Sequence, residues 1–108
     1  MLDIKTTIKV DYIYRSKDFN NAYKKLVKDH RFDVINKLND IIEKLMYRNE
    51  ITKESHNHPL KNGVFDIHIT GDVILLYRYK DNALLLTLEL HNLTNHRDLN
   101  KNLNKIGK

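Results

Sequence analysis

Apolar side chains recur at helical spacing in two consecutive stretches of the chain. The first stretch follows Ser16, a residue that favours the N-cap of a helix, and lysines occupy its other face. Its apolar stripe consists of Phe19, Ala22, Tyr23, Leu26 and Val27. A second, longer stripe consists of Val34, Ile35, Leu38, Ile41, Ile42, Leu45 and Met46. The pattern predicts two amphipathic helices whose apolar stripes pack in the core.

The other apolar segments have the composition of strands. Residues 5–14 are rich in β-branched and aromatic side chains, which predicts a first strand before the helices. After the helices, apolar residues alternate with polar ones or form a short continuous run, which predicts three more strands. These strands are expected at 65–69, 73–79 and 83–91.

Polar residues, glycine and proline mark the connections. Thr70-Gly71-Asp72 and Lys80-Asp81-Asn82 have the composition of turns. Residues 48–63, which contain the only proline, are predicted to form a loop. From Asn92 onward the chain is polar and basic, with weak signals for ordered structure.

Strand parity divides the predicted sheet into two faces. A two-residue turn at Asp81-Asn82, and a three-residue turn at 70–72 with Gly71 at positive φ, bring alternate apolar residues to one side. That core face consists of Phe65, Ile67, Ile69, Val73, Leu75, Tyr77, Tyr79, Leu84, Leu86, Leu88 and Leu90. The opposite face consists of Asp66, His68, Leu76, Arg78, Thr87, Glu89 and His91. A face with these ionisable groups suits a binding surface; a plain solvated sheet face is the alternative.

These elements predict an α+β fold in one domain, residues 1–108. A strand is followed by a two-helix hairpin and then by an antiparallel β-meander packed on the helices. The chain has 108 residues, of which 41% are hydrophobic, enough for a single modest core. It contains no cysteine, which excludes disulfides and thiolate metal sites. Neither a signal peptide nor a membrane-length apolar run is recognisable, so a cytoplasmic protein without a membrane partner is expected.

The charge balance favours an anionic partner. Nineteen Lys and Arg against fourteen Asp and Glu give a formal net charge of +5 at pH 7. A positive field of this kind attracts polyanions, of which nucleic acids are the commonest. Many small basic proteins bind no nucleic acid, so the charge permits this partner without requiring it.

Six histidines supply the candidate chemistry. Histidine titrates near neutrality and can both accept and donate protons. Cleavage of RNA needs a base for the ribose 2′-hydroxyl, an acid for the leaving 5′-oxygen and cations for the phosphate, but no metal. A metal site is the competing interpretation. Its support is weak, because the pairs His56/His58 and His91/His96 do not have a recognised ligand spacing.

Several short motifs in the second half of the chain resemble a known family. They are His58-Pro59-Leu60, Gly63, His68-Ile69, Gly71-Asp72, Ile74-Leu75-Leu76-Tyr77, and His96 with Asp98-Leu99. In this order they are similar to the pattern of the YafQ-type mRNA interferases, toxins of the RelE/ParE superfamily. The resemblance implies a RelE/ParE-like fold and a metal-independent endoribonuclease without a cofactor. It also implies messenger RNA on the ribosome as substrate, contacts with ribosomal RNA, and a cognate antitoxin as partner.

The resemblance also implies the site residues. His58, His68, Asp72 and His96 match the family's catalytic positions. His68 or Asp72 is then the base for the 2′-hydroxyl, His96 the general acid, and His58 orients or stabilises the phosphate. Further substrate-binding candidates are Arg78, His91, Arg97 and Lys61.

Three departures from the family pattern keep other functions open. Val73 replaces a tryptophan that would stack on a base, and Asn92 and Thr94 replace an arginine and a glycine before His96. Arg78 or Arg97 is expected to substitute for the arginine. One alternative is a catalytically impaired module that binds RNA or a partner. The other is a ParE-like topoisomerase inhibitor, which would not need the histidines.

Overall fold

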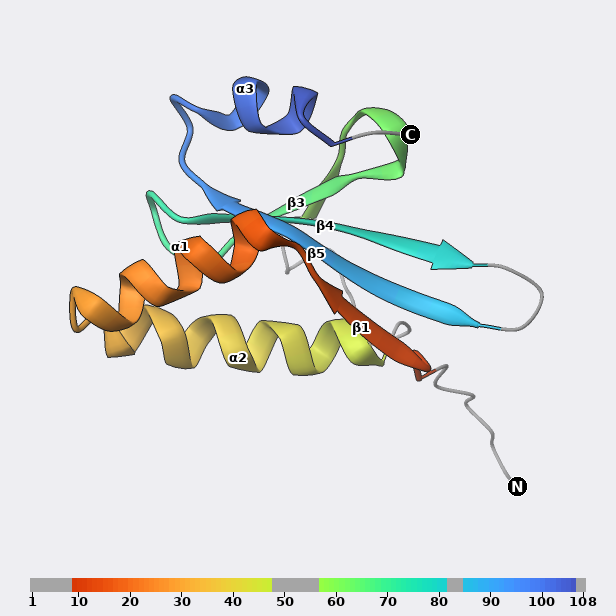
Figure 1. Cartoon of the computed structure of the whole chain (residues 1–108), viewed down its shortest axis with the longest axis horizontal. Helices are drawn as coiled ribbons and strands as arrows, with labels where there is room; N and C mark the ends of the chain where they lie inside the picture. The colour runs from red at the N-terminus through yellow and green to blue at the C-terminus, as the bar shows by residue number, and fades with distance from the viewer. Residues whose placement is uncertain (1–8, 48–56, 82–84, 107–108) are drawn as a thin grey trace.

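Figure 1 shows the computed structural model of the chain, in which residues 9–47, 57–81 and 85–106 are described. A five-stranded sheet has the order β1-β5-β4-β3-β2. Its strands are β1 (Tyr12–Arg15), β2 (Asn57–Pro59), β3 (Phe65–His68), β4 (Ile74–Asp81) and β5 (Leu86–Thr94). β1 pairs with β5 in parallel, and the other pairs are antiparallel. The predicted α+β fold, with a strand, a helical hairpin and a meander, is confirmed.

The helical hairpin covers one face of the sheet (Figure 1). Ser16 caps α1 (Lys17–Lys28) as predicted, because its Oγ accepts a hydrogen bond from the Phe19 N–H at 3.0 Å. His30, at φ 59°, reverses the chain before α2 (Phe32–Met46). Arg31 N–H then bonds to the Leu26 carbonyl and His30 N–H to the Val27 carbonyl, which is the Schellman pattern. Both predicted apolar stripes contribute to the main core, except that Val27 of the first stripe is exposed.

A third helix, α3 (Leu99–Asn104), lies against the opposite face of the sheet, which we call the second face (Figure 1). It follows β5 and forms a smaller core of Val64, Leu76, Leu103 and Ile106, with Leu60 and Leu99 packed against it. The prediction of a weakly ordered tail from Asn92 is therefore wrong. Leucines and an isoleucine spaced for one helical side were present in that segment, but the surrounding Asn and Lys residues hid them.

The predicted loop at 48–63 is also corrected in part. Residues 57–59 form β2, which pairs with β3, and the 3-10 turn η3 (Lys61–Gly63) follows. The remainder, 48–56, lies outside the described residues. Gly63 has φ 75°, whereas Gly71 does not take the positive φ that we predicted for it.

The β4–β5 pairing differs from the prediction in register but not in its faces. Asp81 pairs with Leu86 and Tyr79 with Leu88, so residues 82–85 form the connection in place of a two-residue turn at Asp81-Asn82. The shift from the predicted Leu84 partner is four residues. Since side chains alternate with a period of two, an even shift leaves the described residues of both strands on their predicted faces.

β5 continues to Thr94, three residues beyond its predicted end, through a β-bulge. The register shifts between Leu76 and Tyr77, which leaves His91 as the extra residue on β5. After the bulge Leu93 faces the main core, while Asn92 and Thr94 are buried on the second face. The predicted first strand is shorter than expected, because β1 begins at Tyr12; residues 5–8 are not described.

Candidate functional site

His68 and His96 meet at one end of the second face. His68 ends β3, His96 follows β5, and their rings lie 4.9 Å apart at an interplanar angle of 61°. His96 is exposed, and the His68 side chain is 30% exposed. The buried carboxylate of Asp66 has Oδ2 4.0 Å from His68 Nε2. Two histidines far apart in sequence therefore form a solvent-accessible pair backed by a carboxylate.

Asp72 makes its described contacts with Thr70 and Arg31, not with this pair. It lies in the β3–β4 connection, where its Oδ1 accepts a hydrogen bond from the Thr70 hydroxyl at 3.1 Å. An Arg31 guanidinium nitrogen lies 3.8 Å from the same oxygen. No described contact joins Asp72 to His68 or His96. With a side chain that is 72% exposed, Asp72 forms only a weak surface ion pair.

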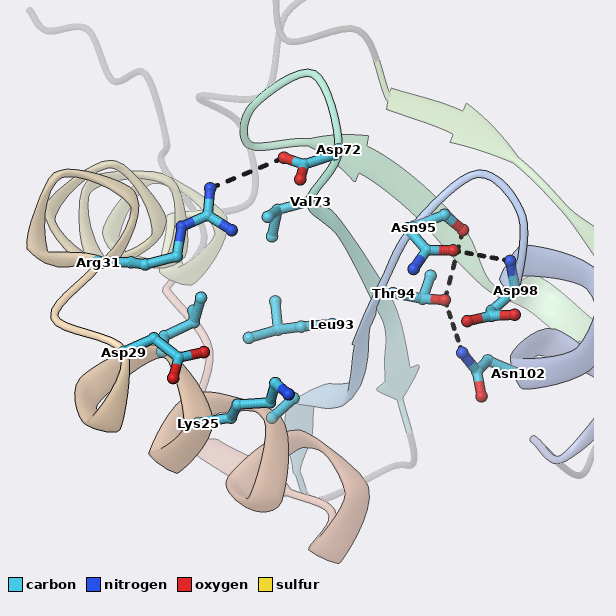
Figure 2. A pocket seen from close by; sticks show the side chains of 12 residues that line it. Lys25, Asp29, Arg31, Asp72, Val73, Leu93, Thr94, Asn95, Asp98 and Asn102 are labelled. Atoms are coloured by element: carbon cyan, nitrogen blue, oxygen red, sulfur yellow. Dashed lines mark hydrogen bonds and ion pairs between the residues drawn. The ribbon is translucent and has the colours of Figure 1, made fainter.

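The Arg31–Asp72 pair lies at a pocket of about 290 Å³ between the helical hairpin and the β5–α3 segment (Figure 2). Lys25, Asp29 and Arg31 line one side, and Asp98 and Asn102 line the other. Its lining residues include three carboxylates and two cations, and neither His68 nor His96. Thus the pocket does not have the acid–base chemistry of the histidine pair.

A second cluster of ionisable groups lies further along the second face. Arg78 Nε donates to Glu89 Oε1 at 2.9 Å, and His91 Nε2 lies 2.8 Å from the same oxygen. The three side chains are only 12–13% exposed. Burial raises the pKa of Glu89, but hydrogen bonds from His91 and Arg78 and their charges outweigh it and lower the pKa overall.

Arg78 is also tied to the turn before β3. Its NH1 donates to the Asn62 carbonyl at 3.1 Å, and a Cβ added at Gly63 would lie 3.6 Å from its side chain. Arg78 therefore holds η3 against the sheet. Arg78 thus has a structural role in addition to the substrate-binding role that we predicted for it.

The other predicted residues are spread around the histidine pair. His58 pairs through its backbone with Asp66, but its side chain lies outside the described set. Arg97 is exposed beside His96, and Lys61 Nζ donates to Asn104 of α3. No described contact joins His91 to Asp72, which contacts Arg31. His91 contacts Glu89 and Tyr14 instead.

Asn92 and Thr94, which take the places of the family's arginine and glycine, form hydrogen bonds within the fold. Asn92 is 8% exposed, and its Oδ1 accepts a hydrogen bond from the Leu93 N–H at 2.8 Å. Thr94 Oγ1 accepts one from Asn102 at 2.6 Å. Neither residue presents a cation, so the charge of the missing arginine is not restored at these positions.

Sequence reasoning overlooked Asp66 and Arg31. Asp66 was placed on the second face, and its position two residues before His68 was the available signal for a partner. Arg31 had no such signal, because it reaches Asp72 only through the packing of the helical hairpin against the sheet.

No group of three or more His, Asp or Glu side chains within 9–47, 57–81 and 85–106 is arranged to hold a metal ion. None of the helices in these ranges combines the length and apolar character needed to cross a lipid bilayer.

Comparisons with known proteins give one family. Residues 11–101 match the model of the family described as bacterial toxin of type II toxin-antitoxin system, YafQ. No curated protein sequence matches the chain at a significant level.

Solved structures of toxins are similar to the chain over most of its length. The Escherichia coli DinJ-YafQ toxin-antitoxin complex contains a chain 28% identical, with a TM-score of 0.66, covering 85% of this chain and 98% of that one. A metal-bound toxin from Helicobacter pylori is 29% identical, with a TM-score of 0.67 and coverage of 85% and 99%. A YoeB/ParE toxin from Agrobacterium tumefaciens shares the fold at 21% identity, with a TM-score of 0.65 and coverage of 79% and 98%.

Proposed function

Because the YafQ model covers residues 11–101, the chain belongs to this family of type II toxin–antitoxin toxins, and on that basis we propose that it is an endoribonuclease that cleaves messenger RNA. The observation that carries the proposal is the approach of His68 and His96, whose rings are 4.9 Å apart on an accessible edge. Two histidines at one site can supply the base and the acid that transesterification of RNA requires.

In the proposed reaction His68 is the base and His96 the acid. His68 takes the proton from the ribose 2′-hydroxyl, the resulting oxyanion attacks the adjacent phosphorus, and His96 protonates the departing 5′-oxygen. Asp66 supports the first role, since a nearby carboxylate favours a histidine that is gaining a proton. The exposure of His96 supports the second.

The remaining predicted residues have supporting roles in this proposal. His58 orients the phosphate, and the exposed Arg97 supplies the positive charge that the family's arginine would give. Asp72 remains a candidate base. Its contact with Arg31 makes it the less favoured of the two, because a base must reach the substrate proton. Arg78, His91 and Lys61 complete the candidate substrate-binding set.

The proposed partners follow from the family and the charge. The substrate is message held on the ribosome, and the net charge of +5 favours contacts with ribosomal RNA. We also propose a cognate antitoxin, since the similar toxin in the DinJ-YafQ complex is bound by one.

Brief expression in bacteria followed by mapping of transcript 5′ ends tests the nuclease proposal. Cuts within reading frames are expected with the wild type, and their loss is expected with His68→Ala and His96→Ala. His30→Asn is the matched control. It removes an exposed histidine from the connection between α1 and α2, and asparagine tolerates the positive φ of that position.

The second candidate function is an RNA- or partner-binding module without catalysis. The observation favouring it is Asn92, a buried neutral residue where the family has an arginine. Cuts that persist in both histidine variants would show that the histidine mechanism is wrong. A wild type that binds its antitoxin but leaves every transcript intact would establish the binding module instead.

A further inference from the structure

Two rows of side chains cross three strands on the part of the second face away from α3. The register places Tyr12, Thr87 and Lys80 in one row. It places Tyr14, Glu89 and Arg78 in the next row. We call these six residues the tyrosine–lysine face. Adjacent strands lie about 4.8 Å apart, so the tyrosines of β1 and the cations of β4 are separated by about 10 Å, with β5 between them.

The tyrosines are among the exposed large hydrophobic side chains of the described residues. Tyr12 is 59% exposed and Tyr14 45%, while Ile13 between them packs on the main core. The Tyr14 ring lies edge-on to His91, with centroids 6.3 Å apart. Two exposed rings on one side of a strand give little to folding, but they offer flat surfaces on which a ligand can stack.

The side chains in the middle of the face are held in place by hydrogen bonds. Glu89 is hydrogen-bonded to both Arg78 and His91, and Arg78 also donates a hydrogen bond to the Asn62 carbonyl. These paired charges largely cancel, which leaves the exposed Lys80 as the cation of the face. Asp81 has the opposite strand parity, and Asp11, which precedes β1, accepts a hydrogen bond from the Leu86 N–H through its Oδ2 at 2.9 Å.

Exposed aromatic rings and a cation on the same face of a sheet are suited to binding single-stranded nucleic acid. Every base has a π-face that can stack on tyrosine, and the backbone phosphates are attracted to lysine. A duplex does not fit, because its bases are already stacked on one another. We propose that the tyrosine–lysine face is a binding subsite for single-stranded RNA, with bases on Tyr12 and Tyr14 and a phosphate at Lys80. The proposal rests on the proposed function, for which it supplies a surface that holds the message on the same face of the sheet as the histidine pair.

Fluorescence anisotropy with a labelled oligonucleotide tests the subsite apart from cleavage. The probe is a short oligoribonucleotide with 2′-O-methyl sugars, which lacks the nucleophile and cannot be cut. Tyr12→Leu and Tyr14→Leu are each expected to weaken binding about tenfold, the loss of one stacked base, without changing its salt dependence. Lys80→Ala is expected to lower the slope of log Kd against log salt concentration by about 0.7, the value for one phosphate contact on a single strand.

The control variants remove similar groups from another part of the chain. Phe32→Leu removes an aromatic ring that is 52% exposed, and Lys37→Ala removes an exposed cation of α2; both should bind the probe like the wild type. Tyr14→Phe keeps the ring and should also bind like the wild type. Thermal unfolding of each variant confirms that it is folded.

The outcomes separate this subsite from the nuclease activity. A wild type that binds the probe through both tyrosines but cuts no transcript would support the subsite and remove the proposed function. Unchanged affinity in Tyr12→Leu and Tyr14→Leu would overturn the subsite, even if cleavage is confirmed. Loss of antitoxin binding in these variants, with RNA affinity intact, would also overturn it and make the face a protein-docking surface.

Discussion

Ser16 joins the start of α1 to strand β5 through one hydroxyl group. Its Oγ accepts a hydrogen bond from Phe19 N–H and donates one to the His91 carbonyl at 2.5 Å. A single small side chain thus satisfies an unpaired N–H at a helix start and the carbonyl of a bulge residue.

Ser16→Ala is expected to lower the free energy of unfolding by about 1–2 kcal/mol, because both hydrogen bonds are lost. Urea unfolding followed by circular dichroism measures the change. Ser16→Asn should recover part of it, since asparagine also caps helices. An alanine variant as stable as the wild type would show that water replaces both bonds at no cost.

Glu89 makes stability depend on pH. Although burial raises its pKa, the hydrogen bonds and charges of His91 and Arg78 lower it overall. A carboxyl whose pKa falls on folding contributes stability that is fully present above the ordinary glutamate pKa. That contribution is lost as the pH falls through the lowered pKa of the folded state.

Glu89→Gln should therefore destabilise the protein at neutral pH by about 2 kcal/mol, the typical value of hydrogen bonds to a charged group. The difference from the wild type should shrink as the pH falls through the acidic range in which Glu89 becomes protonated. Urea midpoints at a series of pH values give the measurement, with the exposed Glu43→Gln as control. If the stability difference between the two proteins stays constant with pH, the destabilisation comes from altered packing and not from the lost charge.

At the scale of elements, α3 divides the second face into a covered half and an open half. Its Leu103 and Ile106 cover Leu76 and Val64, whereas the tyrosine–lysine face has no such cover among the described residues. The covering helix also continues from the segment that carries His96, so its packing helps to place that histidine beside His68.

Leu103→Ala is expected to cost about 2 kcal/mol of stability, near the lower end for a buried leucine because the cluster around it is small. Amide hydrogen exchange should show α3 losing protection before the helical hairpin does. Asn100→Ala, on the exposed side of α3, is the matched control and should change neither quantity. Equal protection of α3 in both variants would mean that polar contacts, such as Asn102 with Thr94, hold the helix.

The elements that sequence reasoning predicted best were those with strong periodic patterns. Both helices and the core face of the meander followed from apolar spacing, and the Ser16 cap followed from the preference of serine for helix starts. The three-residue turn at 70–72 set the correct β3–β4 register. Short elements with few apolar residues, β2 and α3, were not predicted. Their stability comes from partners distant in sequence, which a local pattern does not encode.

The candidate site was likewise predicted only in part. The resemblance to the family singled out His68 and His96, and the structure places their rings together. It also singled out Asp72, whose side chain turns toward Arg31. The direction of a turn residue depends on what packs beside it, and here that neighbour comes from the connection between α1 and α2, much earlier in the chain.

At the scale of the whole molecule, the main core and the exposed candidate functional residues lie on opposite faces of the sheet. One face is buried by the helical hairpin, and the other holds the histidine pair, α3 and the tyrosine–lysine face. Because the two faces share only the backbone of the strands, substitutions of exposed residues on the second face are expected to leave the main core intact. This separation makes variants of the tyrosine–lysine face usable as tests of function.

The parallel pairing of β1 with β5 has a consequence for the order of events during synthesis. Ser16 and the His91 carbonyl are 75 positions apart, and the strand that they adjoin finds its partner only in β5. A nascent chain that has exposed β1 and both helices has no strand against which β1 can pair. Completion of the sheet must therefore wait until β5 has left the ribosome, so that the full fold forms only after most of the chain has been made.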